Sequence, residues 1–362
     1  MNPLHSLFFS LLRMAVGKGG RLPQAPTADE WGLLLQEAKR QALVGVLYDA
    51  LNHLPPDQRP PKAVLIQWHA MTERIAHDNR RLNRDAVWLT ERFARAGFRS
   101  VVLKGQGNAL LYPNPLRRQT GDIDIWLDGR RDDILAYVLR FFPRQKVQWL
   151  EVDVPVLKES VTEVHTAPSL LFCPQDNRIL QTFYERHREA VFTHAIRIPE
   201  GQVFTPTWEV NVVFQLTHIY RHLFHEGIGL RQLMDYFYLL RSSEEGKEAK
   251  FARICPLVRS LHMERFTGAL LWVLREVFGL EEELLFVAPN EAEGRFLLSE
   301  IMLAGNFGQH DERITLSASK WGNFWQITNR NWRFLTRYPR EVLWNPIFRI
   351  RQFLWRKRRG YR

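Results

Sequence analysis

A short alternation of acidic and apolar residues, Asp122-Ile123-Asp124-Ile125, constrains this chain more than any other stretch. Side chains alternate between the two faces of a strand, so a strand here places both carboxylates on one face and both isoleucines in a core. Two adjacent carboxylates repel each other and resist burial unless a cation joins them. The pattern therefore favours a cation site on a small sheet, although a solvated edge strand would show the same alternation.

The ion that best suits such a pair is Mg²⁺, with Mn²⁺ as its substitute. Carboxylate oxygens on a rigid strand are hard ligands, and Mg²⁺ keeps several waters while it bridges to substrate phosphates. Two such ions about 3.5–4 Å apart can stabilise both the attacking and the leaving oxygen of a phosphoryl displacement. The spacing of Asp122 and Asp124 thus predicts a divalent-metal site, without naming a reaction.

An apolar segment that ends in a glycine turn precedes the acidic strand. Val101, Val102 and Leu103 predict a strand, which runs into Lys104-Gly105-Gln106-Gly107. A strand that opens into a glycine-containing turn lets backbone N–H groups approach phosphate oxygens. Lys104 would add a positive charge beside such a phosphate.

This order of strand, glycine turn, spacer and acidic strand resembles the polymerase-beta-like nucleotidyltransferase superfamily. The motifs Leu103-Lys104-Gly105, Tyr112-Pro113, Pro115, Arg117 and Gly121-Asp122-Ile123-Asp124 resemble a bacterial family of uncharacterised nucleotidyltransferases more specifically. The resemblance implies metal-dependent transfer of a nucleoside monophosphate from an NTP, such as ATP, to an acceptor. It also implies that Asp122 and Asp124 bind the metal, and that Lys104, Gly105 and Arg117 contact the nucleotide. The turn Gly105-Gln106 departs from the Gly-Ser or Gly-Gly pair usual in the superfamily.

A site of this kind needs a third carboxylate on a neighbouring strand, to complete the metal ligands or to deprotonate the acceptor. Residues 159–165 predict a strand that carries Glu163, and residues 145–152 predict the strand before it. Glu163 is the preferred third acid, because Glu163-x-His165 resembles the acid-x-His strand of the family. Asp153 is the alternative. His165 shares the face of Glu163 and is expected to orient it.

The second half of the chain carries a further candidate motif. A helix over 208–225 places His218, His222 and His225 on one face, but the first and last lie about 10 Å apart along the axis, too far for one metal ion. The three histidines either line a site or lie in the core with their hydrogen bonds formed. The helix start at Gly227–Arg231 is either an anion site with free N–H groups or an ordinary helical corner. The string from His218 and His222 to Gly229 and Arg231 resembles the family's second motif, which implies that these residues bind the nucleotide.

The net charge of +11 is concentrated at the C-terminus, since residues 349–362 hold seven basic residues and no acid. This tail is a docked surface helix, or it contacts an anionic surface such as lipid or RNA. Two cysteines, Cys173 and Cys255, make no disulfide framework, and no run of 18 uncharged apolar residues occurs. We therefore expect a cytoplasmic protein without a transmembrane span.

The expected architecture is α+β. A palm over 99–205 carries a small mixed sheet, an N-terminal helical region covers 1–98, and a C-terminal helical region with the basic tail covers 206–362. Helices are expected over 28–52 and 63–97, and a hairpin over 195–205. The leading hypothesis is a nucleotidyltransferase whose acceptor is a sugar phosphate, a protein, another small molecule or RNA. The alternatives are a non-catalytic NTP-binding or scaffold protein, and a nucleic-acid- or membrane-surface-binding module that uses the tail.

Overall fold

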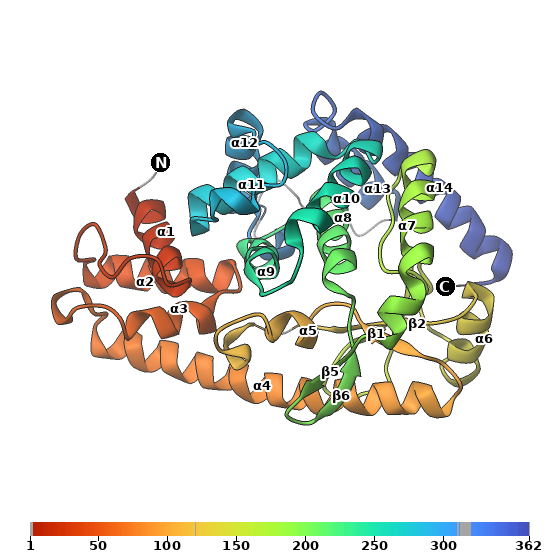
Figure 1. The fold of residues 1–362 in the computed structure, drawn as a ribbon, viewed down its shortest axis with the longest axis horizontal. Helices are drawn as coiled ribbons and strands as arrows, with labels where there is room; N and C mark the ends of the chain where they lie inside the picture. Colours follow the sequence, from red (N-terminus) through yellow and green to blue (C-terminus); the bar gives the residue numbers. More distant parts are fainter. Residues whose placement is uncertain (1–2, 120, 310, 312–319, 362) are drawn as a thin grey trace.

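The computed structural model describes residues 3–119, 121–309, 311 and 320–361, and it has the α+β class expected from the sequence. A four-stranded mixed sheet lies between two helical regions (Figure 1). The sheet strands are β1 (Ser100–Val102), β2 (Ile123–Leu127), β3 (Glu151–Val154) and β4 (Thr162–His165). The predicted hairpin is present as β5 (Ala195–Ile198) and β6 (Gly201–Phe204).

The N-terminal helices are α1 (Pro3–Ala15), α2 (Ala28–Arg40), α3 (Val44–Leu51) and α4 (Lys62–Arg95). The single helix predicted over 28–52 is wrong, because α2 ends at Arg40 and Ala42 takes a positive φ of 55°. The buried Gln41 explains the break, since its side chain accepts a hydrogen bond from the N–H of Leu230 far along the chain. The start of α2 is a capping box formed by Thr27 and Glu30.

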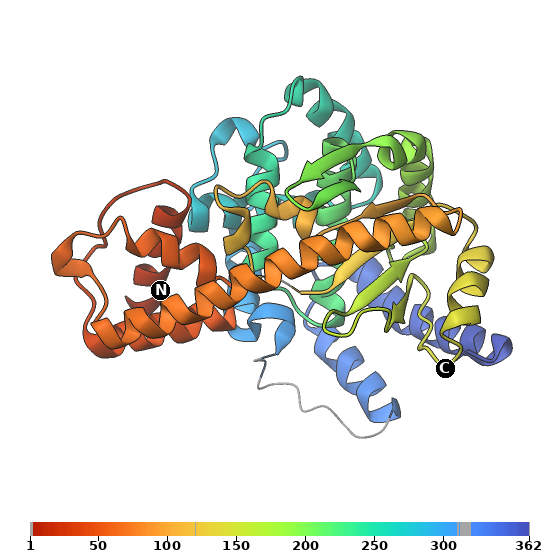
Figure 2. The same ribbon diagram turned by 90° about the horizontal axis from the view of Figure 1, so that it is seen from below.

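Helix α4 runs the length of the molecule beneath the sheet (Figure 2). Its buried Leu82, Leu89 and Phe93 pack against Ile123 and Ile125 of β2. The same layer includes α6 (Arg131–Phe141). Both isoleucines are fully buried, so the predicted inward face of the acidic strand is confirmed.

The strand order is β1-β2-β4-β3, with β2 and β4 parallel and both edge strands antiparallel to their neighbours. The strand predicted over 145–152 begins only at Glu151, because the residues before it form a loop joined to the strand by one bridge between Val147 and Val152. One face of this sheet is apolar and lies on α4 and α6. The other face carries the acids and is covered by C-terminal helices.

Helix α8 covers the acidic face and has the predicted bounds, Trp208–His225. The remaining helices are α5 (Gln106–Ala109), α7 (Pro174–Thr193), α9 (Leu230–Arg241), α10 (Lys247–Ser260), α11 (Glu264–Phe278), α12 (Glu291–Ala304), α13 (Lys320–Trp332) and α14 (Pro339–Arg359). The largest hydrophobic cluster joins α1–α3 to the α8–α12 region. None of the described helices is both long and apolar enough to cross a membrane.

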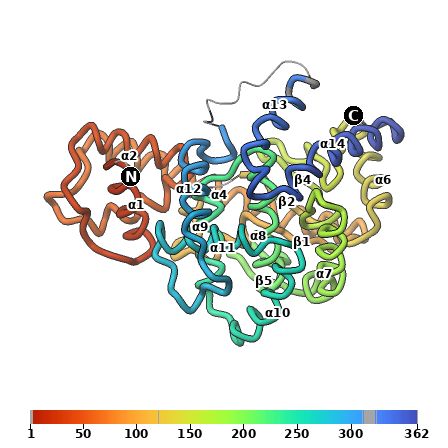
Figure 3. Tube along the Cα trace, turned by 90° about the horizontal axis from the view of Figure 1, so that it is seen from above, coloured from red at the N-terminus to blue at the C-terminus, as the bar shows by residue number. Residues whose placement is uncertain are grey.

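Most of the basic tail belongs to α14, which crosses the molecule near α13 and β4 (Figure 3). Phe348 of this helix packs against Trp149 and Phe172 of the palm. Near its C-terminal end, Trp355 contacts Tyr361, and both pack on the cluster that includes α6. The tail is therefore docked on the body; Arg362 lies outside the described residues.

Candidate active site

Three neighbouring strands bring acids to one face of the sheet. Asp124 on β2 pairs in register with Glu163 on β4, and Asp153 on β3 pairs with Glu163 from the other side. Directly paired residues point to the same face of a sheet. His165 and Glu151, two residues further along β4 and back along β3, share that face because side chains repeat with a period of two.

Asp124 is the centre of this cluster, with a side chain that is 1% exposed. Its Oδ1 lies 2.9 Å from Lys104 Nζ and 3.0 Å from His165 Nε2. Burial alone would raise the pKa of Asp124, but Lys104 and His165 outweigh it and hold that pKa well below its usual value. Asp124 is therefore ionised across the physiological range, held between two cationic groups.

His165 carries a proton at neutral pH. Burial lowers its pKa, but hydrogen bonds with Asp124 and Glu163 outweigh burial and raise the pKa to about 9. The imidazole Nε2 also lies 3.7 Å from Glu163 and 3.8 Å from Glu151. His165 thus links the acids of three strands, and the orienting role predicted for it matches this position.

The negative charges of Asp122 and Glu163 are less well neutralised by neighbouring cations than the charge of Asp124. The charge of Asp124 and then burial raise the pKa of Asp122. Burial and the surrounding acids raise the pKa of Glu163 to about 7, against the hydrogen bond with His165. Asp124, Glu163 and His165 offer ligand atoms that lie within 4.8 Å of one another. Of these three, the two carboxylates can bind a cation at neutral pH, whereas His165 would first have to lose its proton.

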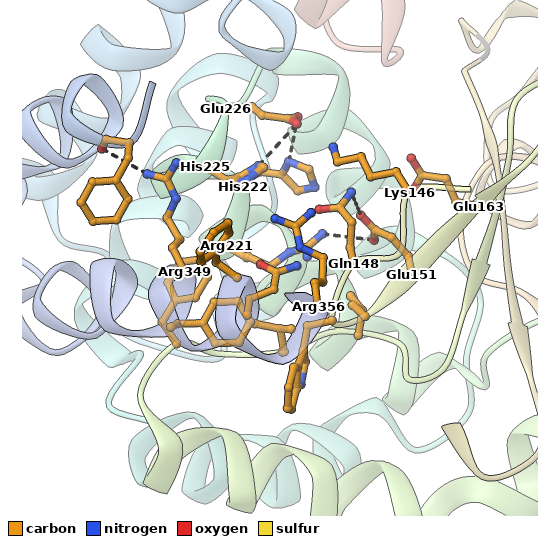
Figure 4. Close-up of a pocket in the computed structure, with 18 of the residues that line it drawn as sticks. Lys146, Gln148, Glu151, Glu163, Arg221, His222, His225, Glu226, Arg349 and Arg356 are labelled. Carbon is orange, nitrogen blue, oxygen red and sulfur yellow. Dashed lines mark hydrogen bonds and ion pairs between the residues drawn. The ribbon is translucent and has the colours of Figure 1, made fainter. Parts of the chain in front are cut away.

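Two cavities meet at this cluster, and Lys104, Asp122 and Phe307 line both. The larger has a volume of about 1190 Å³ and extends past Glu163 and Glu151 toward α14 (Figure 4). The smaller, of about 30 Å³, lies beside Gly105 and Arg231. That is room for about two waters, whereas the larger exceeds the usual range of small-molecule pockets.

Residues of the second motif, on α8 and α9, lie beside the same cluster of acids. His218 approaches Lys104 Nζ at 3.4 Å and lines the smaller cavity, and His222 lines the larger. Burial lowers the pKa of both histidines, for His222 to about 4, so both are neutral at pH 7. Arg231 lines the smaller cavity with Asp122 and Asp124, and its guanidinium donates to the carbonyl of Gln119.

Two N–H groups at the start of α9 are already engaged. The N–H of Gly229 donates to the Gln232 side chain, and that of Leu230 donates to Gln41. Gly229 permits a close approach, since a Cβ there would lie 2.7 Å from Asn306 Cα, and it lines neither cavity. Arg231, in the first turn of α9, does line the smaller cavity, so an anion site at this terminus stays a prediction that depends on Arg231.

The loop Asn306-Phe307-Gly308, which resembles the family in sequence, supplies Phe307, a residue to which the sequence assigned no role in the site. Phe307 adopts a positive φ of 52°, and its ring lies 5.4 Å from that of His222 and 5.3 Å from the guanidinium carbon of Arg231. Gly308 makes this placement possible, because a Cβ there would collide with the Glu226 carbonyl.

Arg117 lies apart from this cluster. Its guanidinium forms ion pairs with Asp49 at 3.1 Å and Glu73 at 3.0 Å in the N-terminal helices, and it lines neither cavity. The neighbouring Arg118 lines the smaller cavity instead. We therefore leave Arg117 out of the candidate site.

Arg118 makes a buried ion pair that the sequence did not indicate. It donates twice to Asp235 on α9, at 2.8 and 2.7 Å, and Tyr112 donates to the same carboxylate at 2.6 Å. These bonds attach the segment between β1 and β2 to α9. They fix the position of the loop that precedes Asp122.

Glu151 is the other acid that sequence reasoning missed. It lines the larger cavity, and Arg221 on α8 lies 3.9 Å from it. Burial opposes ionisation of Glu151, but the charges of Arg221 and His165 lower its pKa. The sequence did contain a signal for Glu151, because Glu151-Val152-Asp153 repeats the acidic-apolar-acidic pattern of residues 122–124. The alternative third acid, Asp153, lines neither cavity.

Comparisons with known proteins identify a family. Residues 27–139 and 163–279 match the family described as uncharacterised nucleotidyltransferase. No curated protein matches the chain. An antigenic nucleotidyltransferase-like protein from Paracoccidioides brasiliensis matches in structure, with 14% identity, a TM-score of 0.34, and coverage of 58% of this chain and 94% of that one.

Proposed function

This chain belongs to the family of uncharacterised nucleotidyltransferases, and on that premise we propose that it transfers a nucleoside monophosphate from an NTP to an acceptor hydroxyl or phosphate. The observation that carries the proposal is that acids of neighbouring segments line two cavities: Asp122 lines both, Asp124 the smaller and Glu163 the larger, and ligand atoms of Asp124 and Glu163 lie within 4.8 Å of each other. Asp122 and Asp124 would hold a divalent ion, and Glu163 would complete its ligands or act as the base.

The donor set suits Mg²⁺ or Mn²⁺. Carboxylate oxygens are the ligands these ions prefer, and the raised pKa values of Asp122 and Glu163 mark negative charge that the protein itself leaves poorly balanced. Lys104 and His165 contact Asp124 on a single oxygen, Oδ1. When bound, the metal would neutralise phosphate charge and orient the reacting groups.

The protein's own groups have distinct tasks in this scheme. Glu163, with a pKa near 7, is poised to accept the proton of the acceptor at neutral pH. The acceptor oxygen then bonds to the α-phosphorus, the bond to the bridging oxygen of the β-phosphate breaks, and pyrophosphate leaves. Lys104 lines both cavities and would contact phosphate oxygens of a nucleotide in the larger one. Gly105 and Arg231 line the smaller cavity and would contact only those phosphate oxygens that lie at its mouth.

The larger cavity is the place for the nucleotide, since the smaller holds only about two waters. A base and sugar would lie past Phe307 and His222, which line the larger cavity. The neutral state of His222 suits a hydrogen-bond partner for a sugar or base.

The experiment that tests the proposal is incubation with α-phosphate-labelled NTPs, Mg²⁺ and fractionated cell extract as the source of acceptor. Label should pass to an acceptor, and Asp122→Asn should reduce the rate at least about 100-fold, because a bound metal contributes several kcal/mol. Asp153→Asn is the matched control, since Asp153 is a strand acid that lines neither cavity. Equal rates in wild type and Asp122→Asn would refute the assignment.

A second candidate is a protein that binds an NTP without turning it over. The contact of Lys104 and His165 with Asp124 favours it, because these two cations already neutralise one acid without a metal. The same incubation separates the two functions. A non-catalytic protein would retain labelled NTP on itself, unaltered, and would pass no label to any fraction.

A further inference from the structure

The larger cavity is lined by cationic side chains as well as by acids. Three of its cationic side chains come from different parts of the chain: Lys146 from the loop before β3, Arg221 from α8 and Arg356 from α14. We call these three residues the cationic wall. In Figure 4, Arg221 and Arg356 extend toward the middle of the cavity from facing helices, while Glu163 lies at its edge.

The cationic wall has little negative charge of its own. Within the described part of the chain, no carboxylate lies within ion-pair distance of Lys146 or Arg356. Arg221 reaches Glu151 only at 3.9 Å, and its buried Nε has no hydrogen-bond partner among the described residues. Three cationic groups that line one cavity repel each other, so an anion between them would relieve that repulsion.

A further arginine of the cavity lining, Arg349 on α14, is already engaged. Arg349 lines the same cavity, but its guanidinium donates to the carbonyl of Phe324 at 3.3 Å. This contact holds Arg349 toward α13, which leaves Arg356 as the arginine of α14 that extends toward Arg221 (Figure 4). The outward face of the helix carries Arg358, which is exposed and lines neither cavity.

We propose that the cationic wall binds the phosphate group of a phosphorylated small-molecule acceptor. The inference rests on the proposed function, because an in-line displacement brings the acceptor to the side of the α-phosphorus opposite the leaving pyrophosphate. If pyrophosphate leaves toward Lys104 and Gly105, the acceptor enters from the side of α14. A phosphate held by Arg356 and Arg221 would orient that acceptor's hydroxyl toward the acids.

The position of the wall inside one partly open cavity indicates a small acceptor. Its residues line a cavity of about 1190 Å³ together with Trp149, Phe348 and Glu163, so a small molecule can span the wall and the acids. Arginine binds phosphate with two parallel hydrogen bonds, and lysine adds a point charge. A sugar phosphate or a free phosphate presents the same group to this wall.

The test is a titration of the full chain with inorganic phosphate, followed by ³¹P line broadening, in EDTA and without nucleotide. We expect saturable binding that weakens about tenfold in Arg356→Ala, which is the scale of one charged hydrogen bond. Arg358→Ala is the matched control, two residues along the same helix, and should bind like wild type. Lys146→Ala, in a surface loop, provides a second variant with the same expected direction if Arg356→Ala does not fold.

Further binding measurements show whether the wall takes the phosphate of a small acceptor, of the nucleotide or of RNA. Phosphate should still bind when a non-hydrolysable Mg²⁺–NTP analogue is saturating, and glucose 1-phosphate should bind at least as well as phosphate. Displacement of phosphate by the analogue, with weaker analogue binding in Arg356→Ala, would assign the wall to the nucleotide and overturn the proposal. Tight binding of a short single-stranded RNA that Arg356→Ala and Arg358→Ala weaken equally would overturn it in favour of a surface contact.

Failure of this inference is distinguishable from failure of the proposed function, because phosphate binding is measured without turnover. NTP turnover with no phosphate binding at the wall overturns only the inference. Phosphate binding that depends on Arg356, in a protein that transfers no label from any NTP, leaves the anion site standing and refutes the enzyme.

Discussion

Removal of the Arg118 side chain should destabilise the protein far more than removal of its neighbour Arg117. Arg118 and Asp235 are a buried pair with two hydrogen bonds. Loss of one partner from a buried pair leaves an uncompensated charge, at a cost of about 3–5 kcal/mol. Tyr112 still donates to Asp235, so the expected loss in Arg118→Ala is at the lower end, about 3 kcal/mol.

Arg117 offers the matched comparison. Its partners, Asp49 and Glu73, are 38% and 49% exposed, and ion pairs of that kind contribute about 0–1 kcal/mol. Both variants would be unfolded in urea, followed by tryptophan fluorescence, at pH 7. Equal losses in Arg117→Ala and Arg118→Ala would refute the reasoning from burial.

The pH dependence adds a sharper criterion. Burial opposes ionisation of Asp235, but Arg118 lowers its pKa below the unfolded value. The stability from this pair is therefore present above the unfolded pKa of about 3.9 and is lost as pH falls through the lower folded value. Without Arg118, burial raises the pKa, so the variant is penalised at pH 7 and the penalty fades toward pH 4. A deficit that stays constant from pH 7 to pH 4 would contradict this account.

Three other predictions follow from the site. Asp122→Asn should raise the free energy of unfolding of the metal-free protein, because Asp124 raises the pKa of Asp122. Asp124→Asn should lower it, because Lys104 and His165 stabilise that carboxylate. Urea unfolding in EDTA would measure both changes in the free energy of unfolding. Changes of the same sign in the two variants would contradict the different charge environments assigned to Asp122 and Asp124. Turnover should rise with pH as Glu163 loses its proton, with a midpoint below the metal-free pKa of about 7, because a bound cation favours the ionised carboxylate. Turnover by Glu163→Gln should be slow and should not change with pH; a rate that still rises with pH in this variant would exclude Glu163 as the base. Truncation after Pro346 should lower the melting temperature, because it removes the contacts of Phe348 with the palm; an unchanged melting temperature would show that α14 does not stabilise the body.

The parts of the fold that the sequence predicted are those with strong local patterns. The alternation around Asp122 and Asp124 predicted a strand with its isoleucines inward, and the structure confirms it. Helix α8 was predicted to the residue, because its periodic apolar positions follow a proline and end before a glycine. These features depend on neighbours within a turn or a strand, so the sequence contains them directly.

The parts that the sequence did not predict depend on distant partners. Arg118 and Asp235 are 117 residues apart, and nothing in either segment indicates the other. The break between α2 and α3 depends on a bond from Leu230 to Gln41, across 189 residues. The tail was recognised as a basic segment with apolar residues, but its place beside the acids follows from packing of Phe348 on Trp149. Periodicity within α14 could not identify that partner.

The central claim is that Asp122, Asp124 and Glu163 form a divalent-metal site that presents an NTP to the larger cavity. Titration with Mn²⁺, followed by electron paramagnetic resonance of the free ion, tests it most directly. We expect saturable binding that tightens when an NTP is added, that is lost in Asp122→Asn and Glu163→Gln, and that survives in Asp153→Asn. Mn²⁺ binding that is equal in all four proteins, or absent from the wild type with NTP present, would contradict the account.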